Sequence, residues 1–215
     1  VISGNHSDGV LIGSFQTTGT KVQGNRIGTN SSGTAAIPND GDGIRIDVAQ
    51  NNLIGGSEPG AGNLISGNGR NGSGTGRGNG ISAGGSNNVI QGNLIGTNVT
   101  ATGPLRNLLN GVAGGRNTTV GGTGVGEGNI IAFNELSGIT NNGPLGTSSS
   151  YRGNSIHSNG PNASPFFPGL GIDLGPFGPT ANDPGDSDTG SNNLQNFPII
   201  TSVTASGGTT NVKGS

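Results

Sequence analysis

The sequence has no cysteine, methionine or tryptophan. Without cysteine, a disulfide framework, a thiolate metal site and a cysteine nucleophile are all excluded. Charged side chains are also scarce, at 9% of 215 residues with a net charge of −2, and the nine basic residues are spread singly from Lys21 to Lys213. Because no basic patch exists, we expect no nucleic-acid partner.

Long apolar runs are missing as well. Segments such as Val10-Leu11-Ile12 are far too short to cross a bilayer, so we predict no membrane span. His6 and His157 are single and far apart in the sequence, which supports neither a zinc site nor a catalytic triad. The chain starts at Val1 inside what reads as a repeat, so we expect a processed product or a piece of a longer protein.

Glycine, in contrast, is abundant, with 47 of the 215 residues, whereas only 27% of the residues are hydrophobic. Such a composition often indicates disorder, but here the branched aliphatic residues recur in short clusters flanked by Gly and Asn, which is typical of stacked β-coils. One repeated segment reads Gly-x-Ile or close to it, and starts at Gly9, Gly43, Gly80, Gly111, Gly138 and Gly171. The other reads Gly-Asn-x-Ile-x-x-Asn and occupies residues 24–30, 62–68, 92–98, 128–134 and 153–159.

Both segments alternate aliphatic with polar or small residues, which is the periodicity of a strand. The Gly and Asn residues at their ends tolerate the left-handed backbone of sharp corners. The sequence therefore predicts an all-β fold: a right-handed parallel β-helix with short irregular corner loops, a buried aliphatic column and a C-terminal extended strand segment. Candidates for the column, of which alternation directs only some inward, are Ile44, Ile46, Ile81, Leu94, Ile95, Ile130, Ile139 and Ile172.

An asparagine ends every Gly-Asn-x-Ile segment, so five asparagines hold equivalent places after a strand. Asn side chains stacked at a turn can hydrogen-bond along the axis of a parallel stack. We predict such a stack at Asn30, Asn68, Asn98, Asn134 and Asn159.

Composition also divides the chain into three parts. Residues 1–178 carry the β-helix pattern, and residues 179–196 form an acidic closing loop rich in Gly, Pro and Asn. Residues 197–215 are a strand segment, which we interpret either as the start of a β-sandwich module or as a strand donated to a neighbour.

Three motifs carry a resemblance to a known family: Gly-Asn-x-Ile-Gly-Thr-Asn at residues 24–30 and 92–98, Asn-Leu-Ile-Gly-Gly at residues 52–56, and the acidic loop at residues 182–190. They resemble bacterial secreted or surface right-handed parallel β-helix repeat proteins of the pectate-lyase-like superfamily, over nearly the whole chain. The resemblance implies an extracellular or cell-surface location in a bacterium. It also implies that residues 194–198 close the solenoid and lead into a small β-sandwich module.

That superfamily includes polysaccharide lyases and hydrolases, whose chemistry needs paired carboxylates, or a basic residue beside Ca²⁺, on one exposed face. Asp42, Arg45 and Asp47 come closest, and we interpret them as a solvated outer face with a local ion pair. Asp173 lies several coils from Asp47, too far to cooperate with it. We therefore favour an extracellular structural or adhesive solenoid without catalysis. The alternative is a carbohydrate-active or carbohydrate-binding β-helix.

The sharpest charged feature is an acidic loop with Asp183, Asp186 and Asp188. Oxygen ligands on a flexible loop suit Ca²⁺, which is the only cofactor that the sequence suggests. The alternative is an exposed acidic turn held by Asx hydrogen bonds.

The C-terminal segment is apolar and extended, which fits addition to the strand edge of a neighbouring subunit. Head-to-tail contacts of this kind do not close and so produce filaments. We predict a fibre- or stalk-forming protein whose partners are itself and surface polysaccharide, with assembly residues Phe197, Ile199, Ile200, Val203 and Val212. The alternative is an excised piece of a longer surface protein.

Overall fold

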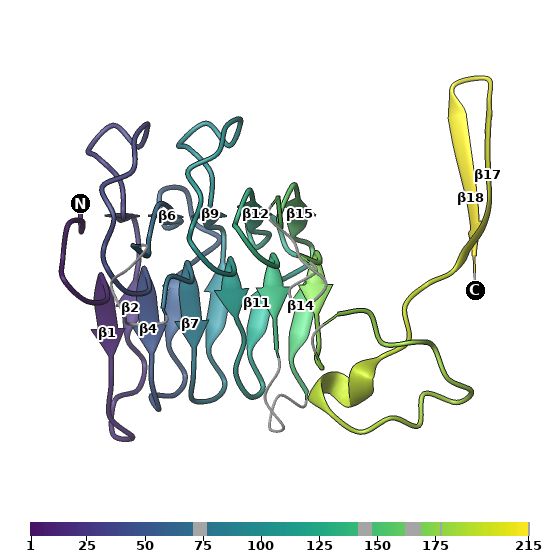
Figure 1. Ribbon diagram of the computed structural model, residues 1–215, viewed down its shortest axis with the longest axis horizontal. Helices are drawn as coiled ribbons and strands as arrows, with labels where there is room; N and C mark the ends of the chain where they lie inside the picture. Colours follow the sequence, from purple (N-terminus) through teal and green to yellow (C-terminus); the bar gives the residue numbers. More distant parts are fainter. Residues whose placement is uncertain (71–76, 142–147, 162–168, 177, 215) are drawn as a thin grey trace.

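The computed structural model describes residues 1–70, 77–141, 148–161, 169–176 and 178–214. Their strands form three parallel sheets that run side by side along one axis, followed by a separate two-stranded hairpin (Figure 1). Each coil passes through the first, second and third sheet in turn. The next coil then lies one strand spacing, about 4.8 Å, further along the axis. The chain is thus a parallel β-helix, as the sequence predicts.

The first sheet is built from the Gly-x-Ile segments. Its strands lie in register, with Ile44 opposite Ile81 and Val112 opposite Ile139. The order of its strands is β1 (Val10–Ile12), β4 (Ile44–Ile46), β7 (Ile81–Ala83), β10 (Val112–Ala113), β13 (Ile139–Thr140) and β16 (Ile172–Asp173).

The second and third sheets have five strands each among the described residues. The second sheet has the order β14 (Ser150–Arg152), β11 (Thr119–Gly121), β8 (Val89–Gln91), β5 (Leu53–Gly55) and β2 (Lys21–Val22). The third sheet is built from the Gly-Asn-x-Ile segments and has the order β15 (Ser155–His157), β12 (Ile130–Ala132), β9 (Leu94–Ile95), β6 (Leu64–Ile65) and β3 (Arg26–Ile27).

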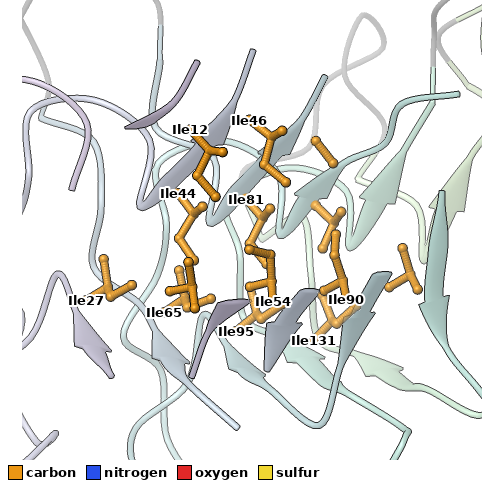
Figure 2. Packing of buried hydrophobic residues seen from close by; sticks show 14 of the residues in the cluster. Ile12, Ile27, Ile44, Ile46, Ile54, Ile65, Ile81, Ile90, Ile95 and Ile131 are labelled. Carbon is orange, nitrogen blue, oxygen red and sulfur yellow. The ribbon is translucent and has the colours of Figure 1, made fainter. Parts of the chain in front are cut away.

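The three sheets enclose a continuous column of branched aliphatic side chains (Figure 2). Burial of each such side chain stabilises the fold by about 1.5–3 kcal/mol. Of the predicted column residues, Leu94 and Ile130 instead lie on the outer side of the third sheet, because their neighbours Ile95 and Ile131 point inward. Ile172, on the last strand of the first sheet, is 40% exposed.

Two corner loops, residues 29–36 and 97–104, project from the coils between the third and first sheets (Figure 1, top). Each is closed at its base by an antiparallel bridge, Thr29 to Ala36 and Thr97 to Pro104. The loops touch each other, since the N–H of Val99 donates to the carbonyl of Gly33 over 3.0 Å.

The chain leaves the coils after β16 and passes through a short 3₁₀ helix, η1 (Ser191–Leu194). It ends in an antiparallel hairpin of β17 (Ile200–Ser206) and β18 (Thr209–Gly214). All residues of both strands are exposed, and Figure 1 shows the hairpin standing away from the coils.

Candidate functional site

A ladder of asparagine side chains runs along the corner that follows the third sheet. Each side-chain amide donates to the side-chain oxygen of the asparagine in the next coil, over 2.7–3.0 Å. The members are Asn5, Asn39, Asn68, Asn107, Asn134 and Asn159. Three of the five asparagines chosen from the sequence therefore lie in this ladder.

Asn30 and Asn98 do not belong to it. Their side-chain oxygens instead accept the backbone N–H groups of Thr34 and Thr102, at 2.9 and 3.0 Å, at the bases of the two projecting loops. Each loop inserts residues before the corner, so Asn39 and Asn107 take the ladder position.

The sequence does contain a signal for the correct members. Asn39, Asn107 and Asn134 each precede the first glycine of the next Gly-x-Ile segment by four residues, whereas Asn30 and Asn98 do not. Asn5 has the same spacing, but Asn68 and Asn159 precede their glycines by twelve residues, so the spacing to the following strand identifies four of the six members.

A second ladder follows the second sheet and uses the Asn of each Gly-Asn-x-Ile segment. Its members are joined over 2.8–3.2 Å and are Asn25, Asn63, Asn93, Asn129 and Asn154. A third, mixed row contains Asn52, Asn88, Thr118 and Ser149, and η1 supplies its last member. There Asn192 accepts the N–H of Ser149 and donates to its carbonyl, both over 2.9 Å.

A fourth row, between the third and first sheets, begins with carboxylates. Asp8 accepts the N–H of Asp42 over 2.8 Å and pairs with Arg77 at 3.2 Å. Asp42 accepts the N–H groups of Gly78 and Asn79 and the side-chain amide of Asn79, over 2.8–3.1 Å. Burial raises the pKa of Asp42, although these hydrogen bonds oppose the shift.

The charged residues that come closest to a catalytic set in the sequence do not form one site in the structure. Arg45 and Asp47 form an ion pair of 3.1 Å on the outer face of the first sheet, while Asp42 is buried in its hydrogen-bonded corner. Asp173 does not face solvent either: it is 3% exposed and accepts the N–H groups of Gly175 and Gly178. Asp42 and Asp173 therefore hold backbone turns in place.

The acidic loop is a hydrogen-bonded turn. One oxygen of Asp183 accepts the hydroxyl and the N–H of Ser187, over 2.6 and 3.0 Å, which lowers the pKa of Asp183. Asp186 accepts the N–H of Asn196 over 2.9 Å. Within the described ranges, no three His, Cys, Asp or Glu side chains are arranged to hold a metal ion. The three-carboxylate ligand set with Asp188 is thus not formed.

The apolar C-terminal residues are open to solvent. Phe197, Ile199, Ile200, Val203 and Val212 are between 49% and 64% exposed. Val203 and Val212 lie opposite each other in the hairpin. Phe197 is anchored through its backbone, which exchanges two hydrogen bonds with the side chain of Asn182.

A hollow with a volume of about 600 Å³ lies at the corner between the first and second sheets. We call it the corner trough. It is lined by Phe15, Val48, Gln50, Ser86, Arg116, Asn117, Asn141 and the paired glycines 84–85 and 114–115.

The corner trough lies beside turns whose lengths differ between coils. Thr18, Gln50, Ser86 and Arg116 are joined by bridges and are therefore equivalent positions. The turns between the first sheet and these positions are residues 13–17, 47–49, 84–85 and 114–115. Phe15 and Arg116 lie outside every repeated motif, so the repeats do not predict them; the unequal turn lengths are the signal that the sequence offers.

Comparisons with known proteins do not assign this chain to a family: no family model, curated protein or solved structure matches it. Among the residues that the structure describes, no helix has the length and apolar character needed to span a membrane.

Proposed function

We propose that this chain is an extracellular structural or adhesive solenoid without catalysis, of the kind found in bacterial surface β-helix proteins of the pectate-lyase-like superfamily. The observation that supports the proposal most is the set of side-chain ladders along the corners. They bind every coil to the next, and buried amide networks of this kind stiffen a structure when all their members are satisfied. Such a body suits a spacer or a stalk.

The proposed assembly uses the C-terminal hairpin. An isolated two-stranded hairpin is marginal in water, and its exposed Val203 and Val212 form one small apolar face. Addition of such a hairpin to a neighbouring subunit would cover this face and produce head-to-tail contacts.

Removal of residues 199–215 tests the assembly. We expect the full chain to form threads or higher oligomers in light scattering and electron microscopy, and the shortened chain to remain monomeric with the same melting temperature. A matched pair of variants separates the two faces: Val203→Asp with Val212→Asp should abolish assembly, whereas Thr204→Asp with Asn211→Asp should not. An assembly state that is unchanged by truncation would contradict the proposal.

The second candidate function is carbohydrate binding or cleavage, which the corner trough supports because it combines an exposed aromatic ring with amide and hydroxyl side chains. Incubation with polyuronides and neutral glycans, with and without Ca²⁺, tests it. Release of fragments would establish an enzyme, and binding without release would establish a binding module. If neither occurs, this candidate is wrong.

A further inference from the structure

Asn192 in η1 occupies the place in the mixed row where a further strand of the second sheet would begin. Its side chain bonds both backbone groups of Ser149, the residue just before β14, over 2.9 Å. In the earlier coils, the second residue after this row points inward and packs in the aliphatic column. These inward residues are Ile54, Ile90, Val120 and Tyr151. The same spacing from Asn192 gives the next inward position to Leu194.

The chain forms a left-handed turn at this point instead of a strand. Asn192, Asn193 and Leu194 have φ angles of 48°, 54° and 51°. Asparagine tolerates this backbone conformation, whereas the Cβ of a bulky residue such as leucine comes too close to the following carbonyl. The strain of the turn therefore falls on the one residue whose side chain the column could bury.

The edge of β14 beyond the last coil is unpaired. Ser150 donates its N–H to Thr118 and Arg152 accepts the N–H of Gly122, so the N–H and C=O of Tyr151 point away from β11. Among the described residues, no backbone group bonds Tyr151 on that side. An unpaired strand edge can accept one more extended segment.

A hollow of about 480 Å³ lies along this edge. Its lining includes β14 on one side and residues 195–198 on the other, together with Ile172 and Leu174. Ile172 is the inward residue at the end of the first sheet and is 40% exposed. A leucine side chain placed after Tyr151 would fill part of this hollow and cover the end of the column.

From this geometry we propose that residues 193–195 exchange between the left-handed turn and a sixth strand of the second sheet. In the strand state, residues 193–195 pair with β14 in register, and Leu194 packs against Tyr151 at the end of the column. Asn192 is the pivot: it still accepts the N–H of Ser149, as Asn88 accepts that of Asn52. The exchange closes the end of the β-helix and does not depend on the proposed function.

Hydrogen bonds to the acidic loop hold the turn state. The side chain of Asn182 exchanges two hydrogen bonds with the backbone of Phe197, over 2.8 and 2.9 Å. The N–H of Asn196 donates to Asp186 over 2.9 Å. These contacts fix the residues that follow the turn and so oppose the movement of residues 193–195 onto β14.

Disulfide trapping in the full chain tests the exchange, because the chain has no cysteine of its own. Arg152→Cys with Gln195→Cys places two thiols at facing positions of adjacent strands, about 4.8 Å apart at the backbone, which a disulfide can span. In Ser150→Cys with Gln195→Cys, the two positions are out of register and about 8 Å apart, which is too far. We expect the first pair to oxidise at least tenfold faster than this control pair.

Two substitutions of Leu194 shift the exchange in opposite directions. Valine is β-branched, so it favours the strand and disfavours the left-handed turn. Asparagine tolerates the turn and is unfavourable in an apolar column. We expect the first cysteine pair to be trapped about threefold to tenfold faster with Leu194→Val and at least tenfold slower with Leu194→Asn. Trapping rates that neither substitution changes would show that the thiols meet in the turn state, and would overturn the proposal.

Hydrogen exchange gives a second measurement without added cysteines. In the strand state, the N–H of Tyr151 donates to the carbonyl of Asn193, so its protection should rise in Leu194→Val and fall in Leu194→Asn. The N–H of Val120 is the control, because β11 is paired on both sides and its protection should not change. Asn182→Ala, which releases Phe197, should raise the protection of Tyr151 as Leu194→Val does. Equal protection of Tyr151 in the wild type and all three variants would contradict the exchange.

Discussion

In the interior, a small residue in one coil leaves space for a larger side chain in the next coil. On the first sheet, the inward position that follows the pairing of Ile46 with Ala83 is Gly114 in the next coil. On the second sheet, the position opposite Val120 in the next coil is Tyr151. The Tyr151 hydroxyl accepts the side-chain amide of Asn141 over 2.6 Å, and a Cβ atom at Gly114 would lie 3.0 Å from this oxygen. The glycine therefore provides the space that the tyrosine fills.

Because of this contact, we predict that Gly114→Ala and Tyr151→Phe have non-additive effects on the free energy of unfolding. Gly114→Ala should destabilise the wild-type fold by about 1–3 kcal/mol, because the added methyl group is forced against the Tyr151 hydroxyl. In a Tyr151→Phe background that oxygen is absent, so the same substitution should cost about 1 kcal/mol less. Urea unfolding of the four proteins measures the difference, and additive effects would show that the two residues are not in contact.

We predict that Asp42→Asn increases the stability of the fold by an amount that depends on pH. Because burial raises its pKa above the unfolded value, the folded state binds the proton more tightly, and the contribution of Asp42 to stability falls as the pH rises through its folded pKa. Asp42→Asn removes the buried charge and its repulsion from Asp8, and keeps an oxygen for Gly78 and Asn79. We expect a higher melting temperature at neutral pH. The gain should shrink as the pH is lowered toward the ordinary Asp value of about 3.9.

The control is Asp47→Asn, which removes the same charge from the exposed outer face of the first sheet. Its surface ion pair with Arg45 contributes about 0–1 kcal/mol, so this variant should be neutral or slightly less stable at neutral pH. A gain of similar size in both variants would mean that net charge, not burial, is responsible.

At the scale of an element, the second ladder predicts a stability gradient along its length. Asn93 lies in the middle, where it accepts two hydrogen bonds from Asn63 and donates to Asn129, Ile54 and Gln91, all over 2.9–3.0 Å. Asn93→Ala leaves several buried groups without partners and should cost about 2–4 kcal/mol. Asn25→Ala, at the partly exposed first member, should cost about 1 kcal/mol. Equal losses in urea unfolding would contradict the ladder's role.

The same ladders show how far the sequence predicts the structure. The alternation of Ile with small residues between Gly and Asn is sufficient to predict the strands, the coils and most of the core, because strand period and corner chemistry agree. It fails at Asn30 and Asn98, where an inserted loop separates the end of one strand from the corner. It also fails at the corner trough, whose lining residues Phe15 and Arg116 belong to turns of different coils and lie outside the repeated segments.

The closing loop predicts the response to metal. Hydrogen bonds from Ser187 and Asn196 use one oxygen each of Asp183 and Asp186, and no third acidic side chain in the described ranges joins them in a metal-binding arrangement. We therefore expect millimolar Ca²⁺ or EDTA to leave the melting temperature unchanged. A rise with Ca²⁺ that Asp183→Asn and Asp186→Asn abolish would restore the calcium site suggested by the sequence.

In the whole molecule, each coil is stabilised mainly by its contacts with the coils on either side. Each strand of the β-helix pairs only with strands of the adjacent coils, so a stack of this kind transmits a local defect mainly to its nearest neighbours. Ile90 on β8 is 0% exposed and lies in the middle of the column (Figure 2). Ile90→Ala should therefore cost about 2–5 kcal/mol through the cavity that it leaves.

Hydrogen exchange then shows where this loss is felt. In Ile90→Ala, we expect amides of β5, β8 and β11, the strands of the same sheet in the adjacent coils, to lose most protection, and those of β3 and β15 to lose least. Val203→Ala in the hairpin is the control and should leave all coils unchanged, because Val203 is 59% exposed and its strand pairs only with β18. A uniform loss of protection from end to end would mean that the coils unfold as one globular unit rather than as a stack with local coupling.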